Sequence, residues 1–385
     1  MTERLYYSDS YQRTFEAQVV AAADGGRKIY LDRTAFYPAS GGQPSDSGTL
    51  NGIRVMDVID EDERIAHVLE TPLTAKRVDG TIDWERRFDH MQQHSGQHLL
   101  SAVFEELYAM QTVSFHLGAE SSTIDLNTGS LSREQVHSVE DRVGELVLES
   151  RAIDVQYADA ASVEGLRKAS ERAGTLRIVT IDALDRSACG GTHLRTTAEI
   201  GPLLIRKLDK IRGNVRVEFL CGRRAVRRSR TDYEALAAVA RRLGAALDDV
   251  PQLVEALQEQ ARESEKARRK LAVDLALRRG AELFAAAVED AQGLRRHVER
   301  ASTGLGDELR ALAQGFTGAG RAVFVGVCED PPSVLYATSA ESGIHAGNRL
   351  KEVLASQGGR GGGNAQLGQG SLPSPEALSA LLQVL

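Results

Sequence analysis

Two pairs of potential metal ligands stand at the same spacing in this sequence. His94 and His98 lie four residues apart in HSGQH, and Cys189 and His193 lie four residues apart in CGGTH. Apolar spacing predicts a helix over residues 84–109, and residues four apart on a helix share one face. Because imidazole nitrogens and a thiolate suit Zn²⁺ in a tetrahedral site, the four side chains together predict one zinc centre.

The prediction depends on the convergence of the two pairs, since a helical histidine pair alone is more often structural than metal-binding. Gly190 and Gly191 give the CGGTH segment the backbone freedom to turn both of its ligands inward. His90 also precedes His94 by four residues, but a helix drifts by about 40° over that interval. We therefore expect an ordinary structural role for His90.

The composition is that of a globular chain. Of 385 residues, 42% are hydrophobic and 26% are charged, which fits two or three domains. The chain has no run of 18 apolar residues and no N-terminal signal pattern, so we expect neither a membrane span nor secretion. Three scattered cysteines cannot form a disulfide framework, which indicates a reducing, cytoplasmic location.

Positive charge is concentrated in one segment, although the net charge is −7. Ten basic and two acidic residues lie between Arg206 and Arg230. The ordinary interpretation of such a run is a solvated helix face and strand edge. The segment is nevertheless the best candidate for binding a polyanion such as RNA. The candidate contacts are Lys207, Lys210, Arg212, Arg216, Arg223, Arg224, Arg227 and Arg228.

Local patterns predict the elements that must position these groups. Residues 1–82 are β-rich, with a hairpin signal at Gly25–Gly26. The run PASGGQPSDSG, residues 38–48, predicts a loop because of its Pro and Gly content. A capping-box pattern opens a predicted helix over residues 132–150. Further strands are predicted over residues 176–182, 203–208, 214–221 and 321–330.

The C-terminal part changes in composition. Alanine, arginine and glutamate dominate from about Arg223 to residue 315, which predicts a long helical hairpin or imperfect coiled coil. The run GGRGGGNAQLGQG, residues 358–370, predicts a glycine-rich loop before a terminal helix that starts near Pro375. The predicted fold class is α+β. It comprises a β-rich N-terminal subdomain (1–82), an α+β zinc-binding domain (83–222), a helical arm (223–315) and a small C-terminal α/β domain (316–385).

The ligand motifs belong to longer stretches with a family resemblance. HSGQHLLSAVF and SACGGTHLRTTAEIG resemble the editing domain of alanyl-tRNA synthetases and, more closely, the freestanding trans-editing proteins of the AlaX family. YLDRTAFYPASGGQPSDSG, SFHLGAESSTIDL and GGRGGGNAQLGQG resemble further segments in the same order, and together the stretches span nearly the whole chain. Nothing resembles the aminoacylation domain. The resemblance therefore implies a long-form AlaX protein.

The resemblance implies a reaction and its partners. The expected activity is hydrolysis of the ester that joins serine, or alternatively glycine, to tRNA(Ala). One Zn²⁺ per chain would either activate water or position the substrate, and a four-ligand site favours positioning. The C-terminal domain would contact the tRNA body and could mediate a homodimer. The alternatives are a non-catalytic zinc-stabilised RNA-binding protein and a zinc hydrolase of small acyl esters.

The resemblance also implies roles for individual residues. Thr34 matches the family's threonine that recognises the serine side chain, so we expect it to discriminate serine from alanine. Gln43 would hydrogen-bond the substrate or the backbone, while glycines before it let the main chain approach the tRNA end. Asp125 would orient a histidine ligand. The remaining assignments are Gly41 and Gly42 in the substrate-binding loop, and Ser114 and His116 in the pocket.

Overall fold

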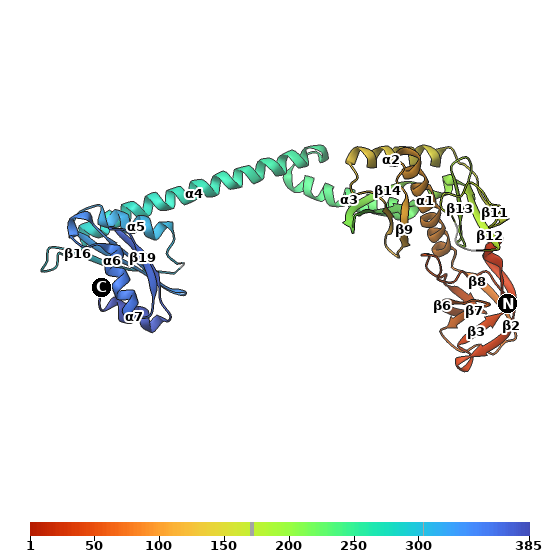
Figure 1. The fold of residues 1–385 in the computed structure, drawn as a ribbon, viewed down its shortest axis with the longest axis horizontal. Helices are drawn as coiled ribbons and strands as arrows, with labels where there is room; N and C mark the ends of the chain where they lie inside the picture. Colours follow the sequence, from red (N-terminus) through yellow and green to blue (C-terminus); the bar gives the residue numbers. More distant parts are fainter. Residues whose placement is uncertain (170–172, 303) are drawn as a thin grey trace. The chain divides into compact units, whose positions relative to one another are not determined.

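The computed structural model describes residues 1–169, 173–302 and 304–385 (Figure 1). These residues form two compact units, Met1–Ala238 and Val239–Leu385. The division between the units falls inside helix α3 (Gly222–Leu243). Each unit combines helices with β-sheets around its own hydrophobic clusters, so the architecture is mixed α/β.

A closed barrel forms the N-terminal part of the first unit. Buried and exposed side chains alternate along its strands β2 and β8, as expected for strands with one face toward a core. Gly80 is needed inside the barrel because a Cβ atom there would lie 2.2 Å from the Phe15 ring. The barrel order is β2 (Thr14–Ala23), β3 (Lys28–Leu31), β7 (Arg64–Leu69), β6 (Ile53–Glu61), β5 (Gly48–Leu50) and β8 (Arg77–Ile82), accompanied by β1 (Glu3–Arg4), β4 (Arg33–Thr34), η1 (Leu5–Tyr7) and η2 (Asp24–Gly26).

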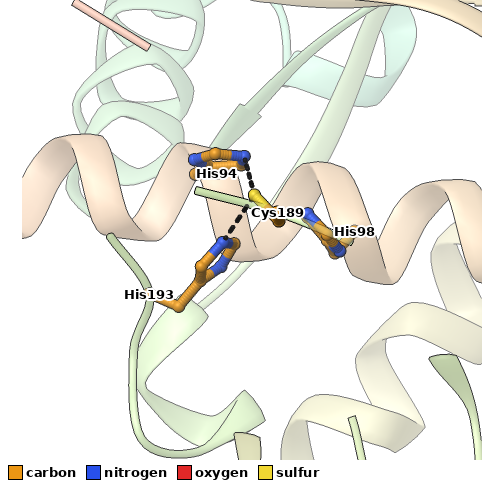
Figure 2. A group of neighbouring side chains, drawn as sticks. All are labelled: His94, His98, Cys189 and His193. Atoms are coloured by element: carbon orange, nitrogen blue, oxygen red, sulfur yellow. Dashed lines mark hydrogen bonds between the residues drawn. The ribbon is translucent and has the colours of Figure 1, made fainter. Parts of the chain in front are cut away.

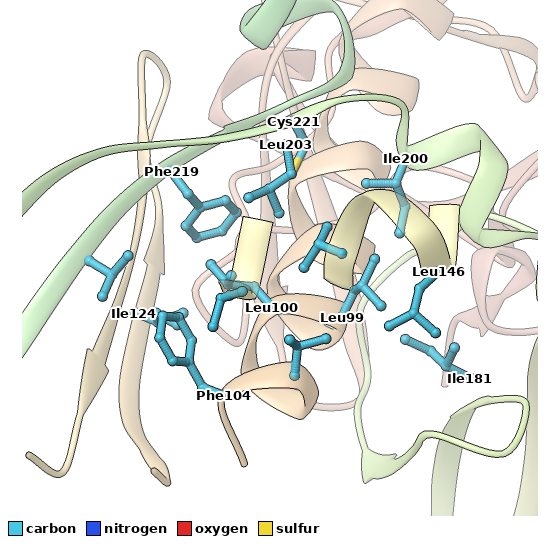
Figure 3. Packing of buried hydrophobic residues seen from close by; sticks show 14 of the residues in the cluster. Leu99, Leu100, Phe104, Ile124, Leu146, Ile181, Ile200, Leu203, Phe219 and Cys221 are labelled. Carbon is cyan, nitrogen blue, oxygen red and sulfur yellow. The ribbon is translucent and has the colours of Figure 1, made fainter. Parts of the chain in front are cut away.

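Helix α1 (Trp84–Tyr108) is the central element of the rest of this unit. Asp83 caps its start by accepting the backbone N–H of Arg86, and Ala109 ends it in the left-handed conformation. Every residue from His90 to Phe104 is buried, so the two predicted histidine ligands lie in the interior. The helix packs against apolar side chains of both neighbouring sheets and of α2 (Figure 3), among them Ile124, Leu146, Ile181 and Phe219.

The elements around α1 match their sequence predictions closely. Helix α2 (Arg133–Leu148) begins with the predicted capping box, formed by Ser132 and Gln135. Strands β12, β14 and β15 confirm the predicted strands between residues 176 and 221. One sheet has the order β14 (Leu203–Ile211), β15 (Asn214–Cys221), β10 (Ser122–Leu126), β9 (Thr112–Leu117), and the other the order β11 (Ile153–Asp159), β12 (Thr175–Ile181), β13 (Asp185–Ala188), followed by η3 (Thr197–Ile200).

The second unit contains a five-stranded sheet and the long helix α4 (Val250–Ala286). The predicted helical character after Arg223 is confirmed by α3 and α4, but the predicted arm extends too far. Strand β16 (Arg295–Ala301) belongs to the sheet, and its arginine- and glutamate-rich sequence hides the strand's alternating burial. The other elements are η4 (Leu247–Asp249), α5 (Asp307–Thr317), β17 (Ala322–Glu329), β18 (Pro332–Thr338), η5 (Ala340–Ser342) and α6 (Ala346–Ser356).

The glycine-rich run near the C-terminus is a hairpin, whereas the sequence predicted a loop. Strands β19 (Arg360–Gly363) and β20 (Leu367–Ser371) pair antiparallel at the edge of the sheet. Glycine is needed because a Cβ at Gly370 would lie 2.3 Å from the Leu354 side chain of α6. The predicted terminal helix is present as α7 (Pro375–Leu382). Within the described residues, no helix combines the length and apolar character that crossing a membrane requires.

Candidate metal centre

The structure brings the four predicted ligands together. One donor atom from each of His94, His98, Cys189 and His193 lies within 4.8 Å of all the others (Figure 2). The Sγ atom of Cys189 is 3.4 Å from Nε2 of His94 and 3.3 Å from Nε2 of His193. The three histidines are at most 4% exposed, while Cys189 is half-buried, so the cluster is largely but not fully shielded from water.

Arg177 holds the segment that carries Cys189 through hydrogen bonds to its backbone. One guanidinium nitrogen of Arg177 donates to the carbonyl oxygens of Cys189 (2.8 Å) and Gly191 (2.9 Å). A Cβ atom on Gly191 would lie 2.1 Å from the ring of His94. Neither Gly190 nor Gly191 adopts a left-handed conformation. At position 191, glycine is therefore needed for close approach and not for the turn freedom that the sequence suggested.

The histidine rings are each fixed through Nδ1, which leaves Nε2 available toward the centre of the cluster. A metal-binding histidine usually has its other ring nitrogen held by an oxygen in this way. Three imidazoles and one thiolate also form a donor set that suits Zn²⁺. The residues therefore fit a zinc ion. The Nδ1 contacts join His94 to Gln43 Oε1 (2.8 Å), His98 to Asp185 Oδ2 (2.9 Å) and His193 to Ser95 Oγ (3.2 Å).

Asp125 differs from its predicted role. Its carboxylate accepts a hydrogen bond from Ser114 Oγ (2.6 Å) and forms an ion pair with Arg216 (2.7 Å). Strand register explains both contacts, because Asp125 lies opposite these residues on the two flanking strands. The carboxylate that does orient a ligand is Asp185, which the sequence analysis missed. Its position four residues before Cys189 is the only signal in the sequence.

The electrostatics of the cluster favour a thiolate. Burial acts to raise the pKa of the Cys189 thiol, but the imidazoles of His94 and His193 outweigh it and hold this pKa well below its usual value. Burial lowers the pKa of His193 to about 3, so this ring is neutral near pH 7. Burial also opposes ionisation of Asp185, yet the hydrogen bond from His98 lowers the pKa of Asp185 to about 2. A thiolate and a neutral imidazole are the forms that bind metal. His98 differs, because burial lowers its pKa but the hydrogen bonds to Asp185 and Cys189 outweigh burial and raise it to about 9, so metal binding there would displace a proton.

The glycine-rich loop reaches the cluster through Gln43. Gly41 (φ 54°) and Gly42 (φ 81°) occupy the centre of a tight turn that non-glycine residues rarely adopt. Beyond the turn, Gln43 accepts from His94 and donates to Thr192 Oγ1 (2.8 Å). Gln43 thus orients a ligand and ties the barrel to the CGGTH segment. Its predicted contact with a substrate stays a prediction.

Strand β9 turns Phe115 toward the cluster. The Phe115 ring lies 5.9 Å from the His94 ring, and a Cβ atom on Gly42 would lie 2.9 Å from it. Because side chains alternate along a strand, Ser114 and His116 point to the opposite face. The structure therefore places Phe115 at the cluster, in place of the two neighbours that the sequence analysis assigned to the pocket.

Thr34 lies in the barrel interior and is fully buried. His67 Nδ1 lies 3.2 Å from the carbonyl oxygen of Ile29, to which it can only donate, so its Nε2 accepts the hydroxyl proton of Thr34 at 2.8 Å. The Thr34 oxygen also accepts the backbone N–H of Phe36 (3.1 Å). Burial lowers the pKa of His67 to about 4, which keeps the ring neutral. His67 has no ligand-spaced partner in the sequence, so its role could not be predicted from spacing.

The basic segment is less cationic than its composition suggests, because carboxylates from both distant and neighbouring parts of the chain pair with it. Arg216 pairs with Asp125, as described, and Arg224 pairs with Asp89 while only 11% of its side chain is exposed. These two arginines mainly hold the fold together. The other ion pairs join Arg223 and Arg227 to Glu85, Arg206 and Arg228 to Asp232, and Lys207 to Asp209.

Two of the predicted RNA contacts are both exposed and free of ion pairs among the described residues. Lys210 and Arg212 are exposed at the turn between β14 and β15. Neither forms an ion pair with another residue in the described part of the chain. Of the predicted RNA contacts, these two have the most freely available charge.

Comparisons with known proteins agree with this geometry. Residues 176–218, which contain Cys189 and His193, match the family described as the threonyl and alanyl tRNA synthetase second additional domain. The mouse protein Alanyl-tRNA editing protein Aarsd1 is 33% identical over 291 residues, covering 70% of this chain and 71% of the mouse protein. Alanyl-tRNA editing protein AlaX-L of Pyrococcus horikoshii is 34% identical over 244 residues, or 59% of each chain. An alanine–tRNA ligase of Pyrococcus abyssi is 29% identical over 407 residues, covering all of this chain and 44% of the ligase.

The ligand cluster and the matched segment define a protein that carries the second additional domain of threonyl and alanyl tRNA synthetases, with both predicted ligands of the CGGTH motif inside it. The chain belongs to the alanyl-tRNA editing protein family. The family resemblance that the sequence motifs predicted is therefore confirmed.

Proposed function

We propose that this chain hydrolyses the ester bond between a wrongly attached amino acid and the 3′ ribose of tRNA(Ala). Seryl-tRNA(Ala) is the proposed main substrate and glycyl-tRNA(Ala) a second one. The names of the related editing proteins support the reaction class. The observation that carries the proposal is the buried cluster of four metal donors, each imidazole fixed by an oxygen of the chain.

One zinc ion per chain is proposed at this cluster. It would be held by Nε2 of His94, His98 and His193 and by the Cys189 thiolate. When bound, such an ion supplies a positive charge that can position the substrate or polarise its carbonyl oxygen. Because four protein ligands close the usual coordination sphere, positioning is the favoured role.

Thr34 is proposed to discriminate serine from alanine. Its hydroxyl proton is committed to His67, so the hydroxyl oxygen can act only as an acceptor toward a substrate. A serine side chain can donate to that oxygen, whereas an alanine side chain cannot. Sites built around such a hydrogen bond discriminate by as much as ~10⁴-fold.

The exposed cations Lys210 and Arg212 are proposed to contact the tRNA backbone. Contacts of this kind weaken as the salt concentration rises, because binding releases counterions. The unit Val239–Leu385 is proposed to contact the body of the tRNA, which would raise the effective concentration of the acceptor end at the metal centre. A homodimer through this unit stays a prediction, which sedimentation of the full chain would test.

Deacylation assays test the proposal directly. The full chain would be incubated with seryl-, glycyl- and alanyl-tRNA(Ala), and the remaining ester measured over time. Selective loss of serine supports the proposal. Retention of all three esters would instead favour a zinc-stabilised RNA-binding protein, and equally rapid hydrolysis of simple amino-acid esters would favour a small-ester hydrolase.

A further inference from the structure

A cleft separate from the metal cluster opens between the first turns of α1 and α3, with a volume of about 700 Å³. The turn after β9 closes one end of it. The cleft combines aromatic, guanidinium and imidazole groups from segments far apart in the sequence. The residues that matter are Trp84, Phe88 and His90 on α1, and Arg223, Arg227 and Arg228 on α3.

The α3 wall presents positive charge that the protein only partly neutralises. Arg223 and Arg227 share one carboxylate, that of Glu85, although each guanidinium offers five N–H donors. Their side chains are 59% and 67% exposed. The N-terminal end of α3 adds the positive end of a helix dipole at the same wall. This wall therefore suits a phosphate group.

The α1 wall presents two aromatic rings beside the carboxylates of Glu85 and Asp89, which pair with arginines of α3. Trp84 and Phe88 lie one helical turn apart, with ring centroids separated by 5.6 Å. Aromatic side chains beside cationic grooves are the surfaces on which unpaired nucleobases stack. A free inorganic anion would use the arginines but would have no use for these rings, so the pair of walls matches a nucleotide.

The imidazole of His90 is a further indication that the cleft binds a ligand. It lines the cleft, is only 4% exposed, and its Nδ1 atom is buried without a hydrogen-bond partner among the described residues. An unpaired buried polar atom lowers stability, so its retention needs a reason. Burial lowers the pKa of His90 to about 4, which makes the ring neutral near pH 7. A neutral imidazole pairs well with the edge of a base.

The position of the cleft indicates which nucleotides of an RNA it would bind. His90 precedes the ligand His94 by one turn of the same helix, a rise of about 6 Å. We propose that the cleft binds the unpaired 3′ nucleotides of the substrate RNA that precede the esterified one. This assignment rests on the proposed function, since the esterified nucleotide must reach the metal centre.

The first experiment measures binding of uncharged RNA hairpins to the full chain by fluorescence anisotropy. One hairpin carries the single-stranded 3′ end of tRNA(Ala), and the other ends at the last base pair. The double variant R227E/R228E should bind the first hairpin at least ~10-fold more weakly and the second within about two-fold of the wild type. The matched control is R133E, an exposed arginine at the start of α2, which should bind both hairpins as the wild type does.

Other results would overturn the assignment. Equally weakened binding of both hairpins would mean that the cleft contacts the duplex backbone. Unchanged binding by the double variant, or no binding by the wild type, would exclude RNA as the ligand of the cleft. The variant H90L gives a second measurement. It should weaken binding of the first hairpin by ~3-fold or more while leaving the melting temperature unchanged or higher, because it removes an unpaired buried group. A lowered melting temperature with unchanged binding would make His90 purely structural.

Failure of this proposal can be told apart from failure of the proposed function. If the wild type deacylates seryl-tRNA(Ala) but the cleft variants bind RNA normally, the cleft assignment fails and the function stands. If the wild type deacylates nothing but R227E/R228E loses binding specifically to the single-stranded end, the function fails and the cleft assignment stands.

Discussion

The candidate metal centre and the barrel interior are both groups of largely buried polar side chains, but they differ in how many of their polar atoms have hydrogen-bond partners. At the metal centre the Nδ1 atom of each histidine has a partner, while three Nε2 atoms and one sulfur face one another. In the barrel, His67 and Thr34 complete each other, and the Thr34 hydroxyl keeps only an acceptor lone pair. The first group turns four donor atoms toward a common centre, and the second leaves at most one lone pair unused.

Unused donor atoms that face one another distinguish a candidate ligand site from a self-contained polar pair. A set of acceptors that face one another is unfavourable without a proton or a cation among them, which makes this cluster a candidate metal site. A polar pair that satisfies itself implies no ion, and any ligand role must come from unused lone pairs. Variants in the two regions should therefore differ in what they change, and the greatest change is expected in substrate selectivity.

Thr34→Val should affect selectivity without affecting metal. Loss of the hydroxyl should reduce the preference for seryl- over alanyl-tRNA(Ala) from as much as ~10⁴-fold toward equality. Relative deacylation rates on the two substrates measure this, with metal content as a second readout. Thr34→Ser keeps the hydroxyl and is the matched control. If selectivity survives in the valine variant, Thr34 is a structural partner of His67 only.

His98→Ala, in contrast, should reduce metal binding. It removes one of the four donors, so the affinity for zinc should fall by more than about 100-fold. Metal content after dialysis against a dilute chelator measures the change. His116→Ala, on the exposed face of β9, is the control and should keep its metal. Undiminished zinc in the His98 variant would exclude this histidine from the site.

Asp185→Asn should weaken metal binding without abolishing it. The amide keeps the shape of the side chain but loses the charge that holds His98, and loss of such a partner typically costs 10- to 100-fold in metal affinity. Competition with a chromogenic chelator measures the affinity. Asp182→Asn, which changes an exposed carboxylate nearby, should leave it unaltered. Equal affinities for the two variants would contradict the orienting role of Asp185.

The barrel should show its own pH dependence. The pKa of His67 in the folded chain is about 4, below the value of about 6.5 in an unfolded chain, so the unfolded state takes up more protons. Stability should therefore fall as the pH drops from 6.5 toward 4, by about 2 kcal/mol at pH 5 from this residue. Urea denaturation at pH 7 and pH 5 measures it. His67→Gln should reduce the loss by that amount, and an unchanged loss would assign the effect to other groups.

The metal ligands could be predicted because their information is local. Four-residue spacing on a helix fixes which face His94 and His98 share, and CGGTH supplies the second pair within five residues. The residues that orient them could not be found in this way. Gln43 and Asp185 lie far from the histidines they contact in sequence, and only the fold brings each pair together.

Charge and glycine patterns were harder to interpret for related reasons. A count along the chain cannot include Asp89 or Asp125, which neutralise Arg224 and Arg216 across strands and helices. Glycine content predicts loops, yet β19 and β20 use glycine to let α6 approach a sheet edge. In both cases the deciding contact is tertiary, so it is absent from any local window of sequence.

Helix α1 runs unbroken from Trp84 through His98. An α-helix resists stretching. The distance between its first turns and the candidate metal ligands is therefore the same whatever the length of the molecule bound along it. The helix therefore sets a fixed distance between the cleft and the candidate metal centre. If the cleft binds RNA as proposed, an end that is one nucleotide too long or too short would place its terminal ribose out of register with the candidate metal centre.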